Sequence, residues 1–562
     1  MRHSKQAGNV ASMTRRHFLE RFGAVGGSTL VMGAMTSWDL MGAQAGPRPV
    51  LTGRPNGTKV IVLGAGLSGL VVGYELGKLG YDYRILEARD RVGGVAWTVR
   101  KGAEHTEIGG ERQVCTFDDG MYVNAGPWRI PHFHTGVLGY CEELNVPLQI
   151  FINEAEASYF YYENKNVGPL AGKRVRLREV KADMIGYTGE LLAKAVDQGQ
   201  LDLPLTAEDK ERLLNFLAVE GYLDDGDHYA YKRNEIRGPG DPYDFKALLQ
   251  SGYGLRVRSV MGGTGQAPMF QPIGGMDQLP KGFQKPIGNR LTLGAEVESI
   301  HQTADGVRVV YKETKNGQKK EITADYCVSC MPLSVLRTLD VNLSPEMAAA
   351  VKSTSYSTSA KMGLQMKRRF WEEDDRIFGG HLYSDLPFGE FSYPSNDFFA
   401  KKGVLLGFYG GGRQSNLHEA PIKSRIEHVL THASKVHPQM RQEFESAYCV
   451  WWEKVKYSLG AYAGGVGFGG GPAQGNAQGD AVARGAGGRG GAGGRGGAGR
   501  GGPGQRGGAQ GGGNTRIAQL NKPDGRIYLG CAALSSSPAW LEGAVAAGWS
   551  TVKSLHERVM RA

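Results

Sequence analysis

Residues 59–94 read KVIVLGAGLSGLVVGYELGKLGYDYRILEARDRVGG, and this stretch decides the fold. Its beginning, residues 59–63, is an apolar run of the kind found in buried parallel strands. Apolar residues then recur at helical spacing over residues 67–79. A second strand is expected over residues 83–86, and it ends at Glu87. The order strand, helix, strand predicts a βαβ unit with a parallel sheet.

Three glycines between the first strand and the helix have separate tasks. Gly64 permits the tight turn, Gly66 lets the backbone approach a pyrophosphate, and Gly69 lets helix and strand pack closely. The helix N-terminus favours the anion. Glu87, 21 residues after Gly66, can accept hydrogen bonds from both ribose hydroxyls. An unrelated glycine-rich turn is the alternative. The pattern predicts a dinucleotide without a 2′-phosphate, either FAD or NAD.

The length of 562 residues exceeds what one core holds, so two or three domains are expected. Of the 85 glycines, 26 fall in residues 464–513, together with five arginines and one aspartate. This segment cannot bury a core, so we predict that it is disordered. Arginine-glycine repeats can bind nucleic acid or other polyanions weakly; a passive insertion is the favoured interpretation. The rest of the chain carries too little of the +10 net charge to indicate a nucleic-acid surface.

The N-terminal residues 1–45 are typical of a targeting segment. Arg15 and Arg16 precede a modestly apolar stretch, and small residues at 43–45 provide a cleavage site. The spacing resembles a twin-arginine signal, which predicts export to the periplasm or beyond; a basic N-terminus without this function is the alternative. No other apolar run is long enough to span a bilayer. The six cysteines show no disulfide spacing, and the C-x-x-C at residues 327–330 is expected in a core strand rather than at zinc.

The segment EARDRVGG, residues 87–94, resembles the flavin amine oxidase family, and the resemblance continues over about residues 58–555 outside the glycine-rich block. It implies FAD as the cofactor. Two departures are Val95, where the family usually has an arginine that reaches the phosphates, and Ala532, where it usually has an acid. The residues that the resemblance assigns to FAD binding are Gly64, Gly66, Gly69, Glu87, Ala88, Arg89, Gly93, Gly94, Gly126, Pro127, Trp128, Val297 and Trp452.

The segment GPWRIP, residues 126–131, places Arg129 among apolar residues, where a charge needs an anionic partner. The segment resembles that of L-amino-acid oxidases and tryptophan-oxidising relatives, in which the arginine holds the substrate carboxylate. By the same resemblance, Tyr393 adds a hydroxyl to that carboxylate, Trp540 covers the reacting face, and Lys361 lies near the flavin N5. The alternatives are that Arg129 pairs with a structural acid such as Glu111 and that the two aromatic residues belong to the core.

The expected fold class is α/β (α+β overall), with a Rossmann-like FAD-binding domain and a discontinuous substrate-binding domain. The first is expected from residues 58–130, 265–340 and 514–560, and the second from residues 131–264 and 341–463. A helix is expected within residues 204–223, with Thr206 as its N-cap. Helices in residues 182–262 are expected to line the substrate entrance. A homo-oligomer, a dimer as the first guess, is expected.

These features predict an exported FAD-dependent L-amino-acid oxidase. Its small-molecule substrates are an L-amino acid and dioxygen, and its products are a 2-oxo acid, ammonia and hydrogen peroxide. No metal is expected, and no histidine lies in a pattern that identifies a general base. Oxidation of amines without a carboxylate is the alternative if Arg129 is structural. A flavin-fold binding or scaffold protein without catalysis is the other alternative, motivated by Val95, Ala532 and residues 464–513.

Overall fold

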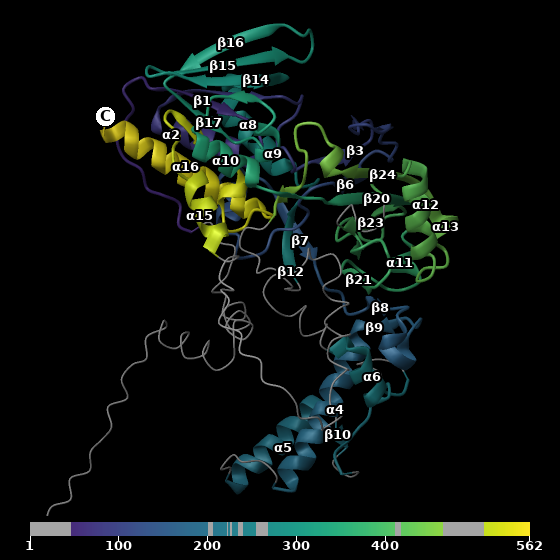
Figure 1. Ribbon diagram of the computed structural model, residues 1–562. Helices are drawn as coiled ribbons and strands as arrows, with labels where there is room; N and C mark the ends of the chain where they lie inside the picture. Colours follow the sequence, from purple (N-terminus) through teal and green to yellow (C-terminus); the bar gives the residue numbers. More distant parts are fainter. Residues whose placement is uncertain are drawn as a thin grey trace, which may run out of the picture.

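The computed structural model describes residues 46–199, 206–221, 223–224, 228–233, 240–254, 268–410, 417–464 and 511–561. Residues 1–45, the predicted targeting segment, and nearly all of the glycine-rich block lie outside these residues, so the predictions for both stay untested. Figure 1 shows an upper part built around β1 and α16, a second sheet beside it, and a helical arm that carries α4 and α5 away from both.

A five-stranded parallel sheet forms the centre of the upper part. Its order is β13 (Leu291–Leu293), β2 (Asp82–Glu87), β1 (Lys59–Leu63), β17 (Tyr326–Ser329) and β26 (Ile527–Leu529). The strand β1 has the predicted bounds, and so does the helix that follows it, α2 (Leu67–Leu79). The predicted βαβ unit is confirmed, although strands far apart in the sequence complete the sheet.

Helices cover one face of this sheet. The apolar face of α2 packs with the long C-terminal helix α16 (Leu541–Arg561) and with α8 (Gln278–Ile287) in one buried cluster. A smaller sheet lies on the other side, in the order β16 (Lys319–Ala324), β15 (Val307–Glu313), β14 (Ala295–Gln302) and β18 (Asp340–Val341). The parallel sheet is therefore buried on both faces, which explains the apolar run in β1.

A seven-stranded mixed sheet forms the second body. Its order is β24 (Phe444–Trp451), β20 (Ala360–Met366), β23 (Gly403–Gly410), β22 (Phe391–Ser392), β21 (His381–Ser384), β8 (Tyr159–Tyr161) and β9 (Val175–Arg176). The helices α11 (Phe370–Glu373), α12 (Ile422–Ala433) and α13 (Met440–Glu443) pack on it. A buried ion pair fixes α12, because Arg425 Nη2 donates to Glu107 Oε2 at 2.8 Å.

The helical arm consists of α4 (Leu177–Asp197), α5 (Ala207–Gly221) and α6 (Phe245–Ser251). The predicted N-cap of α5 is confirmed, because the Asp209 amide donates to Thr206 Oγ1 at 3.1 Å. The sequence Thr206 to Asp209 thus satisfies backbone donors that the first helical turn leaves free. Residues 255–262 of the predicted helical region lie outside the described residues.

The remaining elements connect these bodies. The short strand pairs and the strands within them are β3 (Thr98–Arg100) with β6 (Tyr122–Asn124), β4 (Glu104–Thr106) with β5 (Arg112–Val114), β7 (Leu148–Ile152) with β12 (Pro268–Pro272), β10 (Leu223–Asp224) with β11 (Ala230–Tyr231), and β19 (Tyr356–Ser357) with β25 (Tyr462–Ala463). The other helices are α3 (Thr135–Glu143), η1 (Lys165–Leu170), η4 (Gly288–Arg290), α9 (Leu333–Leu336), α10 (Pro345–Ser353), η5 (Trp452–Lys454), α15 (Gly511–Leu520) and η6 (Ala532–Leu534).

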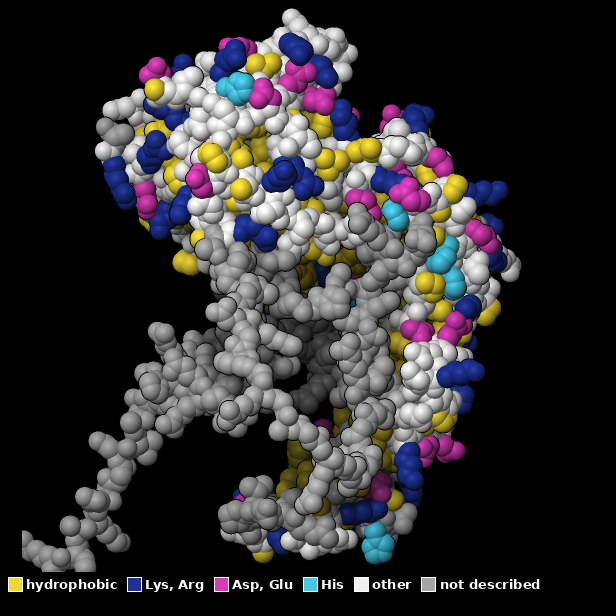
Figure 2. All heavy atoms as spheres, in the orientation of Figure 1, with side chains coloured by type: hydrophobic (Ala, Val, Ile, Leu, Met, Phe, Trp, Pro, Cys, Tyr) yellow, Lys and Arg dark blue, Asp and Glu magenta, His cyan; other side chains and the backbone are white. Residues whose placement is uncertain are grey.

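Two further features are the distribution of charge on the surface and the positions of the cysteines. Basic and acidic side chains are interspersed over the visible face of the described parts, without a continuous basic patch (Figure 2). All six cysteines are buried and unpaired, and Cys327 lies within β17, as expected of a core strand. Within the described ranges, no helix is long and apolar enough to cross a membrane.

Candidate active site

A long cavity opens where the strands of the parallel sheet end. It is bounded by the turn between β1 and α2, by the ends of β2 and β17, and by the start of α16. This is the edge at which open α/β sheets bind their ligands. The cavity brings together most of the predicted cofactor residues: Gly64, Gly66, Glu87, Ala88, Arg89, Gly93, Gly94, Gly126, Pro127, Val297 and Trp452.

The glycines around the cavity divide into two groups. A Cβ added to Gly66 would meet no protein atom within 4 Å, so the residue leaves open space at the start of α2. A Cβ at Gly69 would lie 1.9 Å from the carbonyl oxygen of Gly64, and one at Gly126 would lie 1.8 Å from that of Val95. Gly66 therefore keeps room for a ligand, whereas Gly69 and Gly126 allow segments of the protein to meet.

Glu87 is held in place before any ligand binds. Its side chain is 4% exposed, and it accepts hydrogen bonds from the amides of Ala65 at 2.7 Å and Arg89 at 2.9 Å. Each carboxylate oxygen has two lone pairs, so both oxygens can still accept a ribose hydroxyl. Arg89 in turn donates to Ser458 Oγ at 2.8 Å, which joins this end of the cavity to the segment after η5.

The two departures from the family pattern, Val95 and Ala532, both line the cavity. Other donors stand where phosphates would lie. The first intrahelical bond of α2 runs from Leu70 to Gly66, so the amides of the three residues before Leu70 find no acceptor within the helix. Such a helix N-terminus attracts anions. The residues present thus fit the adenosine and pyrophosphate of FAD without an arginine at position 95.

Lys361 lies on β20 at the other end of the cavity and is 3% exposed. Its Nζ donates to the carbonyl oxygen of Gly126 and lies 4.4 Å from the ring centre of Tyr409 and 4.8 Å from that of Trp128. Burial lowers the pKa of the amine well below its ordinary value, although the nearby Glu390 opposes this shift. Lys361 is therefore a buried amine with a reduced tendency to carry charge.

Arg129 is adjacent to this end of the cavity, with its guanidinium 5.1 Å from the ring centre of Trp128. Its Nη1 donates to Asn153 Oδ1 at 2.8 Å and lies 3.3 Å from Glu390 Oε1. Arg129 thus has an acidic partner, as the alternative expects, but this acid is Glu390 and not Glu111, whose carboxylate accepts from the amide of Ile422. The Nε donor is buried without a partner, and Nη2 has no hydrogen-bond partner in the described part of the chain.

Glu390 and His381 complete the cluster around Arg129. His381 Nδ1 lies 3.3 Å from Glu390 Oε1, and its Nε2 lies 3.2 Å from Arg129 Nη1. Burial lowers the pKa of His381 to about 4, so the ring is neutral near pH 7. Burial raises the pKa of Glu390, but His381, Arg129 and Lys361 together bring it below its ordinary value. Glu390 is therefore the ionised partner of Arg129.

The expectation for Tyr393 is wrong. Its hydroxyl is 2.8 Å from His437 Nε2, and its ring packs in the core of the seven-stranded sheet, away from the cavity. The physical reason is alternation along an extended segment: Phe391 and Tyr393 point into the core, whereas Glu390 and Ser392 point to the opposite face. On that face, Ser392 Oγ lies 2.7 Å from His381 Nδ1.

Trp540 is part of the cavity wall just before α16. Its ring meets His134 edge-to-face, with centres 5.0 Å apart. His134 is 1% exposed, its Nε2 is buried without a hydrogen bond, and burial lowers its pKa to about 3. The neutral His134 ring thus packs against Trp540. The indole Nε1 of Trp452 donates to the carbonyl oxygen of Ala125 at 2.8 Å, and this hydrogen bond fixes the ring.

The sequence alone missed Glu390, His381 and Tyr409. The signal available for Glu390 was the alternation of polar and aromatic residues over 390–393, which puts Glu390 and Ser392 on one face of an extended segment. Tyr409 lies in β23 directly opposite Lys361 on the neighbouring strand β20, and its ring contacts the Lys361 amine. No local pattern indicates this contact, because β20 and β23 are neighbours only in the folded sheet.

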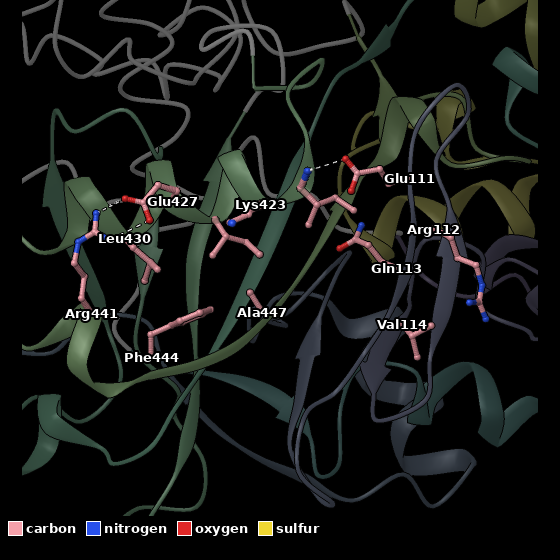
Figure 3. Close-up of a pocket in the computed structure, with 12 residues that line it drawn as sticks. Glu111, Arg112, Gln113, Val114, Lys423, Glu427, Leu430, Arg441, Phe444 and Ala447 are labelled. Carbon is pink, nitrogen blue, oxygen red and sulfur yellow. Dashed lines mark hydrogen bonds and ion pairs between the residues drawn. The ribbon is translucent and has the colours of Figure 1, made fainter.

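A second groove lies between β5 and α12, on the outside of the seven-stranded sheet (Figure 3). Its lining includes an ion pair in which Arg441 Nη1 donates to Glu427 at 3.0 Å, and apolar side chains such as Phe444. None of the predicted site residues lies in it. Among the described residues, no cluster of histidine, cysteine and carboxylate side chains is arranged to hold a metal ion.

Comparison with known proteins agrees with this geometry. The family of flavin containing amine oxidoreductases matches residues 67–471. An L-amino acid oxidase of Bothriechis schlegelii is 29% identical over 430 residues, which cover 73% of this chain and 80% of that protein. An L-amino-acid oxidase of Gloydius blomhoffii is 29% identical over 432 residues, which cover 73% of this chain and 79% of that protein.

Solved structures show the same fold. A triple mutant of putrescine oxidase superposes with a TM-score of 0.55 at 17% identity, covering 89% of this chain and 99% of that one. Cyclohexylamine oxidase from Brevibacterium oxydans superposes with a TM-score of 0.54 at 16% identity, covering 90% of this chain and all of that one. The predicted α/β fold class is thus confirmed, and FAD is the cofactor. This chain belongs to the family of flavin containing amine oxidoreductases.

Proposed function

We propose that the protein oxidises L-amino acids to 2-oxo acids, with release of ammonia and hydrogen peroxide. The observation that carries this proposal concerns Arg129. Its guanidinium lies adjacent to the cofactor cavity, and its hydrogen bonds to the described part of the protein all involve Nη1. A buried N–H without a partner costs about 1–3 kcal/mol. A carboxylate is the group that a planar guanidinium binds best, and it would use the donors that Nη1 leaves over.

The residues around Arg129 would orient the substrate and exclude water. The substrate carboxylate would lie against Arg129, and its α-carbon would then face the cavity between Lys361 and Trp540. The ring of Tyr409 lines this end and that of Trp128 lies beside Lys361, outside the cavity lining; these apolar faces keep the local dielectric low and would strengthen the hold on the carboxylate. Lys361, whose pKa is lowered, would hold a water molecule through a hydrogen bond.

When bound, FAD accepts hydride from the α-carbon and passes the electrons to dioxygen. The imino acid that leaves reacts with water to give the 2-oxo acid and ammonia. The part of the protein in this chemistry is to fix one geometry of the substrate, which can contribute several kcal/mol to the barrier.

The test is the variant Arg129→Gln, assayed with L-leucine and with 3-methylbutylamine, which is leucine without its carboxylate. We expect kcat/KM for L-leucine to fall about 100-fold or more, since a charge-assisted bidentate contact is lost. The yellow colour of bound FAD should remain, because Arg129 is not part of the cofactor cavity wall. Unchanged turnover of L-leucine by the variant would contradict the proposal.

Oxidation of amines without a carboxylate is the second candidate. The observation that favours it is Glu390, which already gives Arg129 an acidic partner. In that case the wild type would oxidise 3-methylbutylamine faster than L-leucine, and Arg129→Gln would affect the two compounds alike. Purified protein that is colourless and takes up no FAD would instead favour a binding or scaffold role.

The proposal extends to the organisation of the chain. We propose the two-domain division at the predicted boundaries, a homodimer, and export directed by residues 1–45. Size-exclusion chromatography with light scattering tests the dimer. Replacing Arg15 and Arg16 by lysine and following the protein in the periplasmic fraction tests the export route.

A further inference from the structure

Glu390 is a carboxylate beside the proposed substrate position that Arg129 and His381 use only in part. Both of its close contacts, to Arg129 Nη1 and to His381 Nδ1, involve Oε1 at 3.3 Å. Within the described ranges, Oε2 has no hydrogen-bond or ion-pair partner. Oε2 therefore has lone pairs left for a ligand that donates a hydrogen bond.

The surroundings of Glu390 indicate what that ligand is. The side chain is 30% exposed, so a ligand can reach it, and it lies beside Arg129. It lies close enough to Lys361, Tyr383 and Tyr409 to influence their ionisation. Tyrosine faces next to a carboxylate are the chemistry that binds ammonium and guanidinium groups.

We propose that Glu390 makes the site selective for L-amino acids with a cationic side chain, by accepting a hydrogen bond from the distal ammonium or guanidinium at Oε2. This inference rests on the proposed function, in which Arg129 holds the α-carboxylate. Opposite charges at neighbouring positions would then read the two charged ends of one substrate. The same arrangement rejects acidic side chains, because a second anion would face Glu390.

The experiment compares L-lysine, L-norleucine and L-glutamate as substrates of the wild type and of Glu390→Gln. Norleucine matches lysine in length and lacks only the terminal ammonium. We expect the wild type to favour lysine over norleucine by about tenfold or more in kcat/KM, as one charge-assisted hydrogen bond provides. In Glu390→Gln this preference should shrink to near unity through the KM for lysine, whatever fall in kcat/KM lysine and norleucine share through the loss of the charge beside Arg129.

The control is Glu321→Gln, an exposed acid on β16 far from the cavity, which should keep the wild-type preference. Equal turnover of lysine and norleucine by the wild type would overturn the inference and leave the proposed function intact. An equal fall in kcat/KM for lysine and for norleucine in Glu390→Gln would also overturn it, since Glu390 would then act on the part of the substrate that lysine and norleucine have in common. A yellow wild-type protein that oxidises none of the three substrates would contradict the proposed function, and with it this inference.

Discussion

At the scale of single residues, burial decides the charge of the groups around the reacting end of the cavity. Lys361 and His381 are both enclosed, and burial lowers the pKa of each. Glu390 stays ionised because it has Arg129 beside it. Arg129 and Glu390 therefore remain as one cation and one anion, next to a neutral imidazole and an amine whose pKa is lowered. Such a site can hold a zwitterion without adding net charge to the interior.

The first prediction concerns Lys361→Met and the pH dependence of stability. The native pKa of Lys361 is lowered, so the unfolded state binds more protons than the native state between that pKa and about 10.4. Wild-type stability therefore rises with pH through this window, by up to about 1.4 kcal/mol per pH unit. The variant lacks this dependence, so its advantage over the wild type should be greatest at low pH and shrink toward pH 10.

Chemical denaturation at several pH values measures this difference. The control is Lys101→Met, whose exposed amine pairs with Asp119 at 3.0 Å. That variant should differ from the wild type by less than about 1 kcal/mol at every pH, as exposed ion pairs do. A free-energy gap between Lys361→Met and the wild type that does not change with pH would show that Lys361 is charged in the native state.

At the scale of elements, the turn between β1 and α2 separates ligand binding from packing. Gly66 is the N-cap of α2 and has an ordinary φ of −65°, so an alanine is compatible with its backbone. Gly69 lies one turn further on, where the helix touches the turn itself. Two glycines of one motif thus have different physical reasons, and substitution should reveal them separately.

The second prediction uses Gly66→Ala and Gly69→Ala as a matched pair. Gly66→Ala should fold with the thermal stability of the wild-type apoprotein but bind FAD about tenfold or more weakly, because its methyl group would occupy the space left for the pyrophosphate. Gly69→Ala should lose about 2 kcal/mol or more of stability, since its methyl group overlaps the Gly64 carbonyl. Thermal melts and titration with FAD give the two readings; equal behaviour of the pair would contradict this division.

At the scale of the whole molecule, the active end of the cavity forms where two sheets meet. The parallel sheet contributes the glycine-rich turn, and β20 and β23 of the seven-stranded sheet contribute Lys361 and Tyr409. The segment after η5 joins them at the adenosine end through Ser458. The glycine-rich block separates that segment from η6 in the sequence, although both border one cavity.

The third prediction concerns that block, whose structure lies outside the described residues. Replacing its five arginines, at positions 484, 489, 495, 500 and 506, by glutamine should leave FAD content and kcat/KM within about twofold of the wild type, because no site residue belongs to it. At physiological salt, both proteins should bind a single-stranded RNA equally weakly in an anisotropy titration. RNA binding that disappears in the variant would assign the block a polyanion role.

Much of the cofactor end could be predicted because its signals are local. The bounds of β1 and α2 follow from hydrophobic periodicity, and Glu87 follows from its spacing to Gly66. The substrate end could not be predicted to the same depth. The role expected for Tyr393 rests on a local resemblance, and only the core around His437 shows that its ring is buried away from the cavity.

The sequence by itself determined the βαβ unit, the separate tasks of its glycines and the presence of an arginine that needs an anion. Each of these depends on residues within a few turns of one another, where backbone geometry and hydrophobic period act directly. Only the tertiary structure decided that the partner of Arg129 is Glu390, 261 residues away, and that Lys361 is buried among aromatic rings. Such contacts depend on which strands become neighbours and which face meets a cavity, and these follow from the packing of the whole chain.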